Sequence, residues 1–136
     1  MEITYAHSGP AVFFLVGGSL TVDADLQGLR AAVCGIADPK VRGVFLDLAQ
    51  VTRLDCSGIG ELTRLHRLVS ASGRTFGLVH VGRRDRRMLD MVGLGVILLM
   101  HDNVRQALDS LPAITRRHES RGPQLPLSYG SASVGS

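Results

Sequence analysis

The feature that most constrains the fold is an apolar run, Val44–Leu48, followed shortly by an amphipathic segment, Ile59–Val69. An apolar run of this length, with hydrophobic residues on both faces, is typical of a strand buried within a sheet. The second segment repeats its apolar residues at helical spacing, so the chain passes from a buried strand into a helix. Between them lies a polar corner, Asp55-Cys56-Ser57-Gly58, whose residue types commonly begin helices.

The same alternation of strand-like and helix-like segments continues along the chain and predicts an α/β domain. The pattern places strands at 3–6, 11–16, 41–48, 75–81 and 96–100, and helices near 21–36, 59–69, 83–92 and, capped by Asp102, 103–111. This spacing indicates a sheet with at least some parallel strands. Later the periodicity disappears and Ser, Gly, Pro and Arg dominate. We therefore expect a domain over 1–112 and a disordered tail over 113–136.

Composition places the chain among globular proteins with an aliphatic core. Its 136 residues are 45% hydrophobic and 20% charged, and a net charge of +3 says little about partners. The two cysteines, Cys34 and Cys56, fit neither a disulfide framework nor a zinc site, and Cys34 is expected to be buried in a helix. No apolar run is long enough to cross a bilayer and no leader precedes the first strand, so we expect a cytoplasmic protein.

Three common kinds of site lack their sequence signatures. A hydrolase nucleophile elbow needs Gly two residues before the serine, and that position is Asp55. The five histidines are scattered without paired spacing, which disfavours a metal site. No Gly-Lys-Ser/Thr sequence follows a strand, which disfavours a nucleotide site. A small enzyme or nucleotide binder that uses a crevice near Asp47 and Asp55 is the least favoured alternative.

The densest charge cluster lies at the start of the helix expected over 83–92. It consists of Arg83, Arg84, Arg86 and Arg87. No aromatic residues are interleaved with these arginines, so a solvated helix face is favoured over a nucleic-acid patch. A protein interface is a third interpretation, because arginine is enriched at interfaces.

Ser57 is the candidate functional residue of the polar corner. A serine at a helix N-terminus lies near free backbone N–H groups and the positive end of the helix dipole, and both favour an anion. A phosphate on Ser57 is therefore expected to find donors in place and to lie close to Asp55 and Asp47. Helix capping alone is the competing explanation of the corner. Cys56 either fills the corner or, as a thiol at a helix N-terminus, is redox-sensitive.

The stretch from residue 44 to residue 60, VFLDLAQVTRLDCSGIG, resembles the central motif of STAS domains. This family includes the anti-sigma factor antagonists and their relatives in sulfate transporters. The resemblance runs from about residue 3 to residue 111 and includes Gly-Ser-Leu at 18–20, Gly73 and Gly93-Leu94. It implies a single STAS-like domain, with a mixed sheet of four to five strands packed by about four helices.

Membership of the antagonist branch implies a regulator of sigma-factor-dependent transcription, not an enzyme, with no cofactor and no metal. Ser57 matches the phosphoacceptor. An anti-sigma factor with serine kinase activity and an ATPase fold is the implied partner: it binds the unphosphorylated form and is released after phosphorylation, and a serine phosphatase resets the system. The implied partner-binding residues are Asp47, Asp55, Cys56, Ser57, Gly58, Ile59, Glu61 and Arg64, with Glu61 and Arg64 on the outward face of the helix.

The sequence departs from the family pattern at two positions. Cys56 stands where serine is frequent, and Thr21 stands where an acidic residue is common. The second position lies near the expected partner surface. The alternative function is a constitutive STAS interaction module, such as a stressosome-type scaffold or a transport accessory subunit, that uses the same face without phosphorylation. We expect no nucleic-acid or membrane partner, and a monomer or weak dimer.

Overall fold

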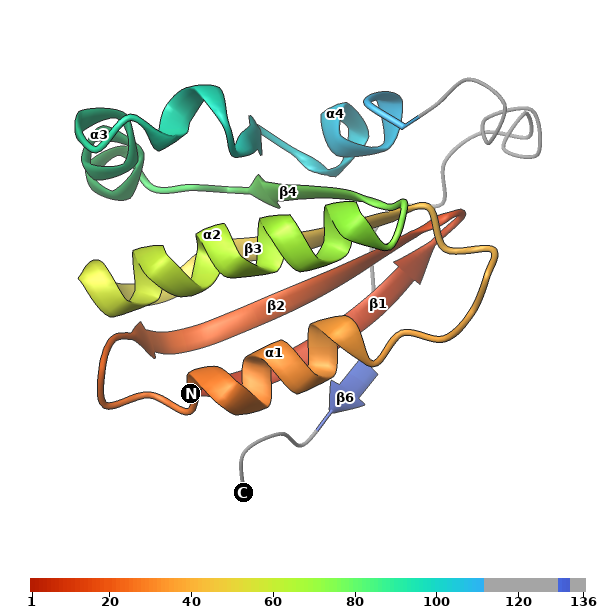
Figure 1. The fold of residues 1–136 in the computed structure, drawn as a ribbon, viewed down its shortest axis with the longest axis horizontal. Coiled ribbons are helices and arrows are strands. Elements are labelled where there is room, and N and C mark those ends of the chain that lie inside the picture. Colours follow the sequence, from red (N-terminus) through yellow and green to blue (C-terminus); the bar gives the residue numbers. More distant parts are fainter. Residues whose placement is uncertain (112–129, 133–136) are drawn as a thin grey trace.

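The computed structural model describes residues 1–111 and 130–132, which form one mixed β-sheet with helices on both faces (Figure 1). The elements, in chain order, are β1 (Glu2–Ser8), β2 (Ala11–Leu20), α1 (Leu26–Cys34), β3 (Gly43–Leu54), α2 (Cys56–Ala71), β4 (Thr75–Val79), α3 (Arg83–Met91), the 3₁₀ helix η1 (Leu94–Val96), β5 (Leu99–His101), α4 (Val104–Asp109) and β6 (Gly130–Ala132). The strand order is β5-β4-β3-β2-β1-β6. Strands β2 to β5 are parallel, whereas β1 is antiparallel to both neighbours. The α/β class and the mixed sheet are thus confirmed.

Alternating side chains of the strands contribute to two separate hydrophobic cores. Val12 and Phe14 of β2 belong to a core with Leu62 of α2, on the face of the sheet that α1 and α2 cover. Phe13 points to the opposite face, where its ring stacks on Phe45 with centroids 5.1 Å apart and α4 covers the pair. The first core holds most of the buried aliphatic residues and also includes Leu89 of α3. Packing against α1 and α2 therefore dominates the stability of the domain.

β2 and β3 are both longer than the sequence pattern predicted. A loop was expected over 49–54, but β3 continues to Leu54. Over this stretch β2 continues to Leu20 and pairs with β3 through two irregularities, each of which adds one residue to β3. The prediction failed because most side chains of 49–53 are exposed and polar, which hides the strand pattern. Since β4 stops opposite Asp47, β3 projects beyond its β4 partner and carries the chain to one end of the molecule.

Three local predictions about helices are wrong. α1 starts at Leu26, where Asp25 accepts a hydrogen bond of 2.9 Å from the backbone N–H of Gly28, and not near 21 or 23. Asn103, rather than Asp102, caps α4. Cys34 is exposed because the residue before it, Val33, faces the core, and one step along a helix turns a side chain by about 100°.

β6 pairs with the outer edge of β1. Residues 130–132 form an antiparallel ladder with residues 3–5 of β1. The expectation that these three residues are disordered is wrong. Without β6, β1 would present unpaired backbone N–H and C=O groups at the sheet edge, and a short extended segment can join such an edge through main-chain hydrogen bonds alone. The rest of the predicted tail, 113–129 and 133–136, lies outside the described residues, as does the predicted boundary at 112.

His80, immediately after β4, has an unusual backbone conformation. Its φ of 56° lies in the left-handed region, and among the described residues every other positive φ belongs to glycine. The His80 N–H donates to the carbonyl of His101 at 3.3 Å, and the side-chain Nδ1 lies 3.2 Å from Oδ1 of the buried Asp47. These contacts hold the chain in a conformation that is unfavourable for a residue with a Cβ atom.

Two substitutions at this position separate the backbone strain from the side-chain contact. Both His80→Ala and His80→Gly remove the contact with Asp47, but only glycine relieves the strain. We expect His80→Gly to have the higher free energy of unfolding, by about 1 kcal/mol, measured by urea denaturation. At the control position Ala71, at the exposed end of α2, replacement of alanine by glycine should instead lower stability. Equal stability of the two His80 variants would contradict this interpretation.

Candidate functional site

The polar corner lies where β3 meets α2. β3 ends at Leu54, Asp55 is the N-cap residue, and Cys56, Ser57 and Gly58 form the first turn of α2. The backbone N–H of Asp55 donates to the carbonyl of Leu20 at 3.3 Å, so the corner lies against the end of β2. In Figure 1 this corner is at the left end of the molecule, near α3.

The carboxylate of Asp55 holds two segments together. Oδ1 accepts a hydrogen bond of 3.0 Å from the backbone N–H of Gly58, and Oδ2 accepts one of 3.0 Å from the backbone N–H of Val22. The Gly58 bond caps α2, and the Val22 bond fixes the connection between β2 and α1. The backbone N–H groups of Gly58 and Val22 lower the pKa of Asp55, and the charge of Arg53 adds to this effect. The carboxylate is therefore a structural part of the corner.

Ser57 is half-buried in the first turn of α2, and its neighbour Cys56 is exposed. The Ser57 hydroxyl has no hydrogen-bond partner among the described residues. The expectation that a phosphate here would find free backbone donors needs correction, because Asp55 already binds the N–H groups of Gly58 and Val22. A phosphate on Ser57 would instead compete with, and repel, the Asp55 carboxylate.

Gly58 allows α2 to lie directly against the end of β2. A Cβ atom at this position would overlap the carbonyl oxygen of Leu20 and lie 2.8 Å from Cδ1 of Leu54. The first of these atoms belongs to the backbone and cannot turn away. At Gly60, two residues farther along α2, a Cβ atom would have no neighbour within 4 Å. Gly58 is therefore required for the close packing of α2 on β2, whereas Gly60 is not.

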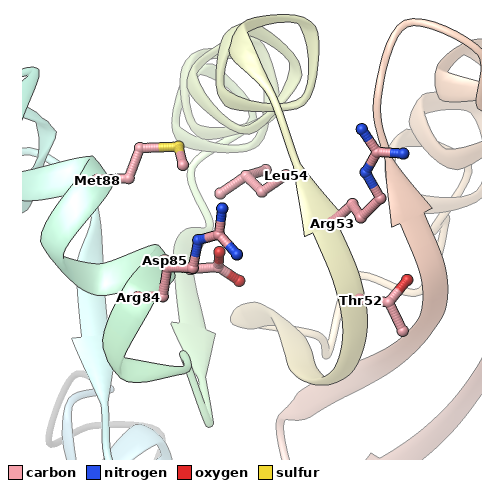
Figure 2. Close-up of a pocket in the computed structure, with 6 residues that line it drawn as sticks. All are labelled: Thr52, Arg53, Leu54, Arg84, Asp85 and Met88. Atoms are coloured by element: carbon pink, nitrogen blue, oxygen red, sulfur yellow. The ribbon is translucent and has the colours of Figure 1, made fainter.

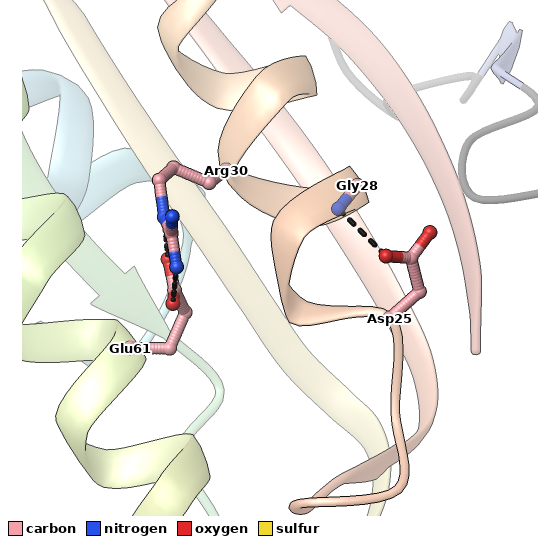
Figure 3. Close-up of polar contacts among 4 residues, drawn as sticks. All are labelled: Asp25, Gly28, Arg30 and Glu61. Carbon is pink, nitrogen blue, oxygen red and sulfur yellow. Dashed lines mark hydrogen bonds and ion pairs between the residues drawn. The ribbon is translucent and has the colours of Figure 1, made fainter.

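The sequence analysis expected Glu61 to face solvent, but its side chain is buried. It is only 4% exposed, and its carboxylate forms a bidentate ion pair with Arg30 of α1 (Figure 3). Arg30 Nε donates to Glu61 Oε2 at 2.9 Å, and Arg30 Nη2 donates to Glu61 Oε1 at 2.6 Å. The hydrogen bonds to Glu61 raise the pKa of Arg30. The outward placement failed because Glu61 lies beside Leu62 on the helix and faces α1, where a charge is stable only when it is paired.

Asp47 lies away from the corner. Its carboxylate is buried, accepts a hydrogen bond of 3.0 Å from the backbone N–H of Ala49 and contacts His80. In the paired strand β2, five residues separate the partner of Asp47 from the partner of Leu54. At about 3.3 Å per residue, Asp47 is roughly 16 Å along the sheet from the end of β3. Its expected place close to Ser57 is therefore wrong, because β3 continues where a loop was predicted.

The other predicted partner-binding residues divide between the surface and the core. Arg64 is exposed and shares one stripe of α2 with Cys56 and Gly60, at spacings of four residues. Ile59 is 8% exposed and packs in the first core. The surface that continues from Ser57 along α2 thus consists of Cys56, Gly60 and Arg64, and sequence reasoning had not selected Gly60.

A small cavity of about 150 Å³ lies beside the corner, between the end of β3 and α3 (Figure 2). It is lined by Thr52, Arg53, Leu54, Arg84, Asp85 and Met88. Burial raises the pKa of Asp85, and the nearby Arg84 acts in the opposite direction. The sequence pattern identified the arginine cluster, but it gave no sign that α3 lies against the end of β3.

The described part of the chain has neither a cluster of metal ligands nor a helix that could span a membrane. Within residues 1–111 and 130–132, no three His, Cys, Asp or Glu side chains are grouped so that they could hold a metal ion. The same residues contain no helix with the length and apolar character that a membrane span requires.

The contrast between the two glycines gives a direct test of the packing at the corner. We expect Gly58→Ala to lower the free energy of unfolding by at least about 2 kcal/mol, because the methyl group meets a backbone carbonyl. The matched control Gly60→Ala should raise it by about 0.5–1 kcal/mol, because alanine favours an open helical position. Denaturant unfolding measures both, and a harmless Gly58→Ala would contradict the close approach.

The lowered pKa of Asp55 predicts a pH dependence of stability. A carboxyl group whose pKa is depressed in the folded state stabilises that state above its unfolded pKa and loses the effect as the pH falls through the folded value. Asp55→Asn should therefore be less stable than the wild type near pH 7, and the difference should shrink below about pH 4. Asp23→Asn, in an exposed loop, is the control and should change little. A difference that stays constant down to pH 2 would show that the Asp55 charge is irrelevant.

Comparison with known proteins agrees with this fold. The sequence profile of the STAS domain matches residues 6–107. A Thermotoga maritima protein named as a candidate anti-sigma factor antagonist is 26% identical over 68 residues, which are 50% of this chain and 60% of that relative. The relative is thus matched over little more than half of its length.

Solved structures with the same fold come from proteins of different functions. The crystal structure of a candidate anti-sigma factor antagonist from Thermotoga maritima has a TM-score of 0.71 at 20% identity, over 80% of this chain and 93% of that one. The unphosphorylated form of the Bacillus anti-sigma factor antagonist SpoIIAA has a TM-score of 0.58 at 19% identity, over 85% and 97%, and its phosphorylated form also has a TM-score of 0.58. A mouse anion transporter of the Slc26 family has a TM-score of 0.66 at 16% identity, over 84% of this chain and 22% of the transporter. Because the STAS profile covers about three quarters of the chain, the protein belongs to the STAS domain family.

Proposed function

We propose that this STAS protein is an anti-sigma factor antagonist whose binding state is set by phosphorylation of Ser57. The observation that carries the proposal is the geometry of the corner. A half-buried serine with an unpartnered hydroxyl lies in the first turn of α2, next to a carboxylate that already binds two backbone N–H groups. The relatives named as anti-sigma factor antagonists support the same assignment.

The Asp55 carboxylate explains why a phosphate would change the surface without a change of fold. Phosphorylation adds between −1.5 and −2 charges at neutral pH. On Ser57 these charges would lie beside Asp55, and the two anions would compete for the N–H groups of Gly58 and Val22. Loss of the bond to Val22 would release the connection between β2 and α1. A partner that fits the unphosphorylated corner would then meet both added charge and an altered loop.

The proposed partner is an anti-sigma factor with an ATPase fold and serine kinase activity. It binds the unphosphorylated corner, phosphorylates Ser57 and is then released, and a serine phosphatase restores the starting state. Cys56, Gly60 and Arg64 supply the exposed stripe of α2 next to Ser57. In this role the protein is a cytoplasmic regulator of transcription and performs no catalysis of its own.

A second candidate function is a constitutive STAS interaction module. It is favoured by the double hydrogen bonding of Asp55, since a corner that is fully explained by helix capping needs no phosphate. Under this alternative Ser57 is a small polar residue in a binding face, and its modification plays no part.

Two Ser57 variants distinguish the candidates. Purified Ser57→Ala and Ser57→Asp proteins serve as baits in lysate from the native organism, and bound proteins are identified by mass spectrometry. We expect the Ser57→Ala bait to capture an ATPase-fold kinase. The Ser57→Asp bait should capture at least about nine-tenths less of this kinase, because like charges brought together at an interface weaken the binding free energy by several kcal/mol. Ser70→Ala and Ser70→Asp, on an exposed position later in α2, are the matched controls and should bind alike.

The two functions predict opposite results with the Ser57 baits. If both baits hold the same partners in the same amounts, the phosphorylation hypothesis is lost and the constitutive module takes its place. Incubation of wild-type protein with the captured kinase and ATP should add one phosphate, at Ser57, and phosphorylation at another residue would also contradict the proposal.

A further inference from the structure

The exposed apolar side chains of this domain are concentrated in one turn. Of the seven large hydrophobic residues that are exposed in the described chain, five lie within residues 91–99. They are Met91, Val92, Val96, Ile97 and Leu99, and we refer to them as the apolar turn. Val96 is 91% exposed and Met91 is 80% exposed. Exposed apolar side chains that are concentrated in one segment mark interaction sites more often than scattered ones do.

The apolar turn is held in a fixed conformation. Leu98 is buried, and its backbone N–H donates to the carbonyl of Leu94 at 2.8 Å. Leu94 packs against the first core, and Gly93 reverses the chain in the left-handed region with a φ of 81°. The outward side chains are therefore presented by a turn that is anchored on both sides. Such preorganisation lowers the entropic cost of binding.

Positive charge lies next to the apolar turn on the same helix. Arg84, Arg87 and Met91 follow one another at spacings of three and four residues along the exposed side of α3. Arg83 is also exposed, and the charge of Arg84 acts on the neighbouring Asp85. A partner that covers this surface needs apolar groups for the turn and carboxylates for the arginines.

α3, which leads into the apolar turn, lies at the same end of the molecule as the Ser57 corner. Met88 and Arg84 of α3 line the same cavity as Leu54, which immediately precedes the corner (Figure 2). Figure 1 shows α3 and the start of α2 together at the left end. A standard interface buries about 800 Å² on each protein, which is wide enough to include both.

We propose that the apolar turn is the anchor by which the partner of the Ser57 corner is held, and that this partner has an apolar cleft rimmed by carboxylates. The inference rests on the proposed function for the identity of that partner. The exposed stripe at the corner, with Cys56, Gly60 and Arg64, is small and polar, and an interface needs a desolvated apolar centre. The apolar turn supplies this apolar centre, and the charge at Ser57 controls whether the partner stays bound. The binding free energy thus comes mainly from the turn, whereas regulation comes from the first turn of α2.

The experiment compares what each surface contacts in the cell. A photo-crosslinking amino acid replaces Val96 in the turn, Cys56 in the corner, or Lys40, an exposed control position just before the start of β3, each in the full chain. The expected result is that positions 96 and 56 crosslink the same protein and position 40 does not. With that protein purified, Met91→Ser combined with Val96→Ser should weaken its binding to the Ser57→Ala form at least about tenfold, while Lys40→Ser leaves it unchanged.

The outcomes separate failure of this inference from failure of the proposed function. If positions 96 and 56 crosslink the same protein in both the Ser57→Ala and Ser57→Asp forms, the anchor is supported and the phosphorylation switch is lost. If position 56 crosslinks a kinase and position 96 crosslinks nothing, a different protein or only another copy of this chain, the anchor is overturned. Co-sedimentation with phosphatidylserine vesicles that depends on Met91 and Val96 would overturn it in favour of a lipid surface.

Discussion

The close contact between α2 and the end of β2 is the constraint on which the corner depends. A Cβ atom at Gly58 would occupy the space of the Leu20 carbonyl oxygen. The first turn of α2 can therefore lie this close to the end of β2 only with glycine at position 58. The contact fixes where Ser57 emerges and lets one carboxylate reach both the helix and the preceding loop. Farther along α2, the ion pair between Glu61 and Arg30 sets the position of α1. Together these contacts align two helices on one face of the sheet.

The division between the two faces of the sheet also shapes the site. α1 and α2 cover the larger core, whereas α4 covers a smaller one built around the stacked rings of Phe13 and Phe45. α3 lies at the end of the sheet, beyond the short β4, and faces the part of β3 that β4 does not reach. The projection of β3 therefore creates both the corner and the surface on which α3 presents its arginines and the apolar turn.

The sequence predicted the order of strands and helices and the strand–corner–helix unit because these depend on local periodicity and on capping residues. It failed where a side chain's environment is set by a distant segment. Glu61 is buried because Arg30 of another helix faces it, and Asp47 is remote from Ser57 because β2 extends and pairs with a polar stretch of β3. The exposure of Val96 could not be read from an apolar run that looked like a buried strand.

The hydrogen bond from Val22 to Asp55 has a consequence for the direction in which signals can travel. Because one carboxylate serves the loop and the helix, the conformation of the loop and the chemistry at Ser57 are thermodynamically linked. Linkage is reciprocal. If modification of Ser57 loosens the connection between β2 and α1, a molecule that moves this connection away from Asp55 also lowers the free-energy cost of adding an anion to the first turn of α2. A protein that binds the connection can thereby influence how readily Ser57 is modified, even though it does not contact the hydroxyl.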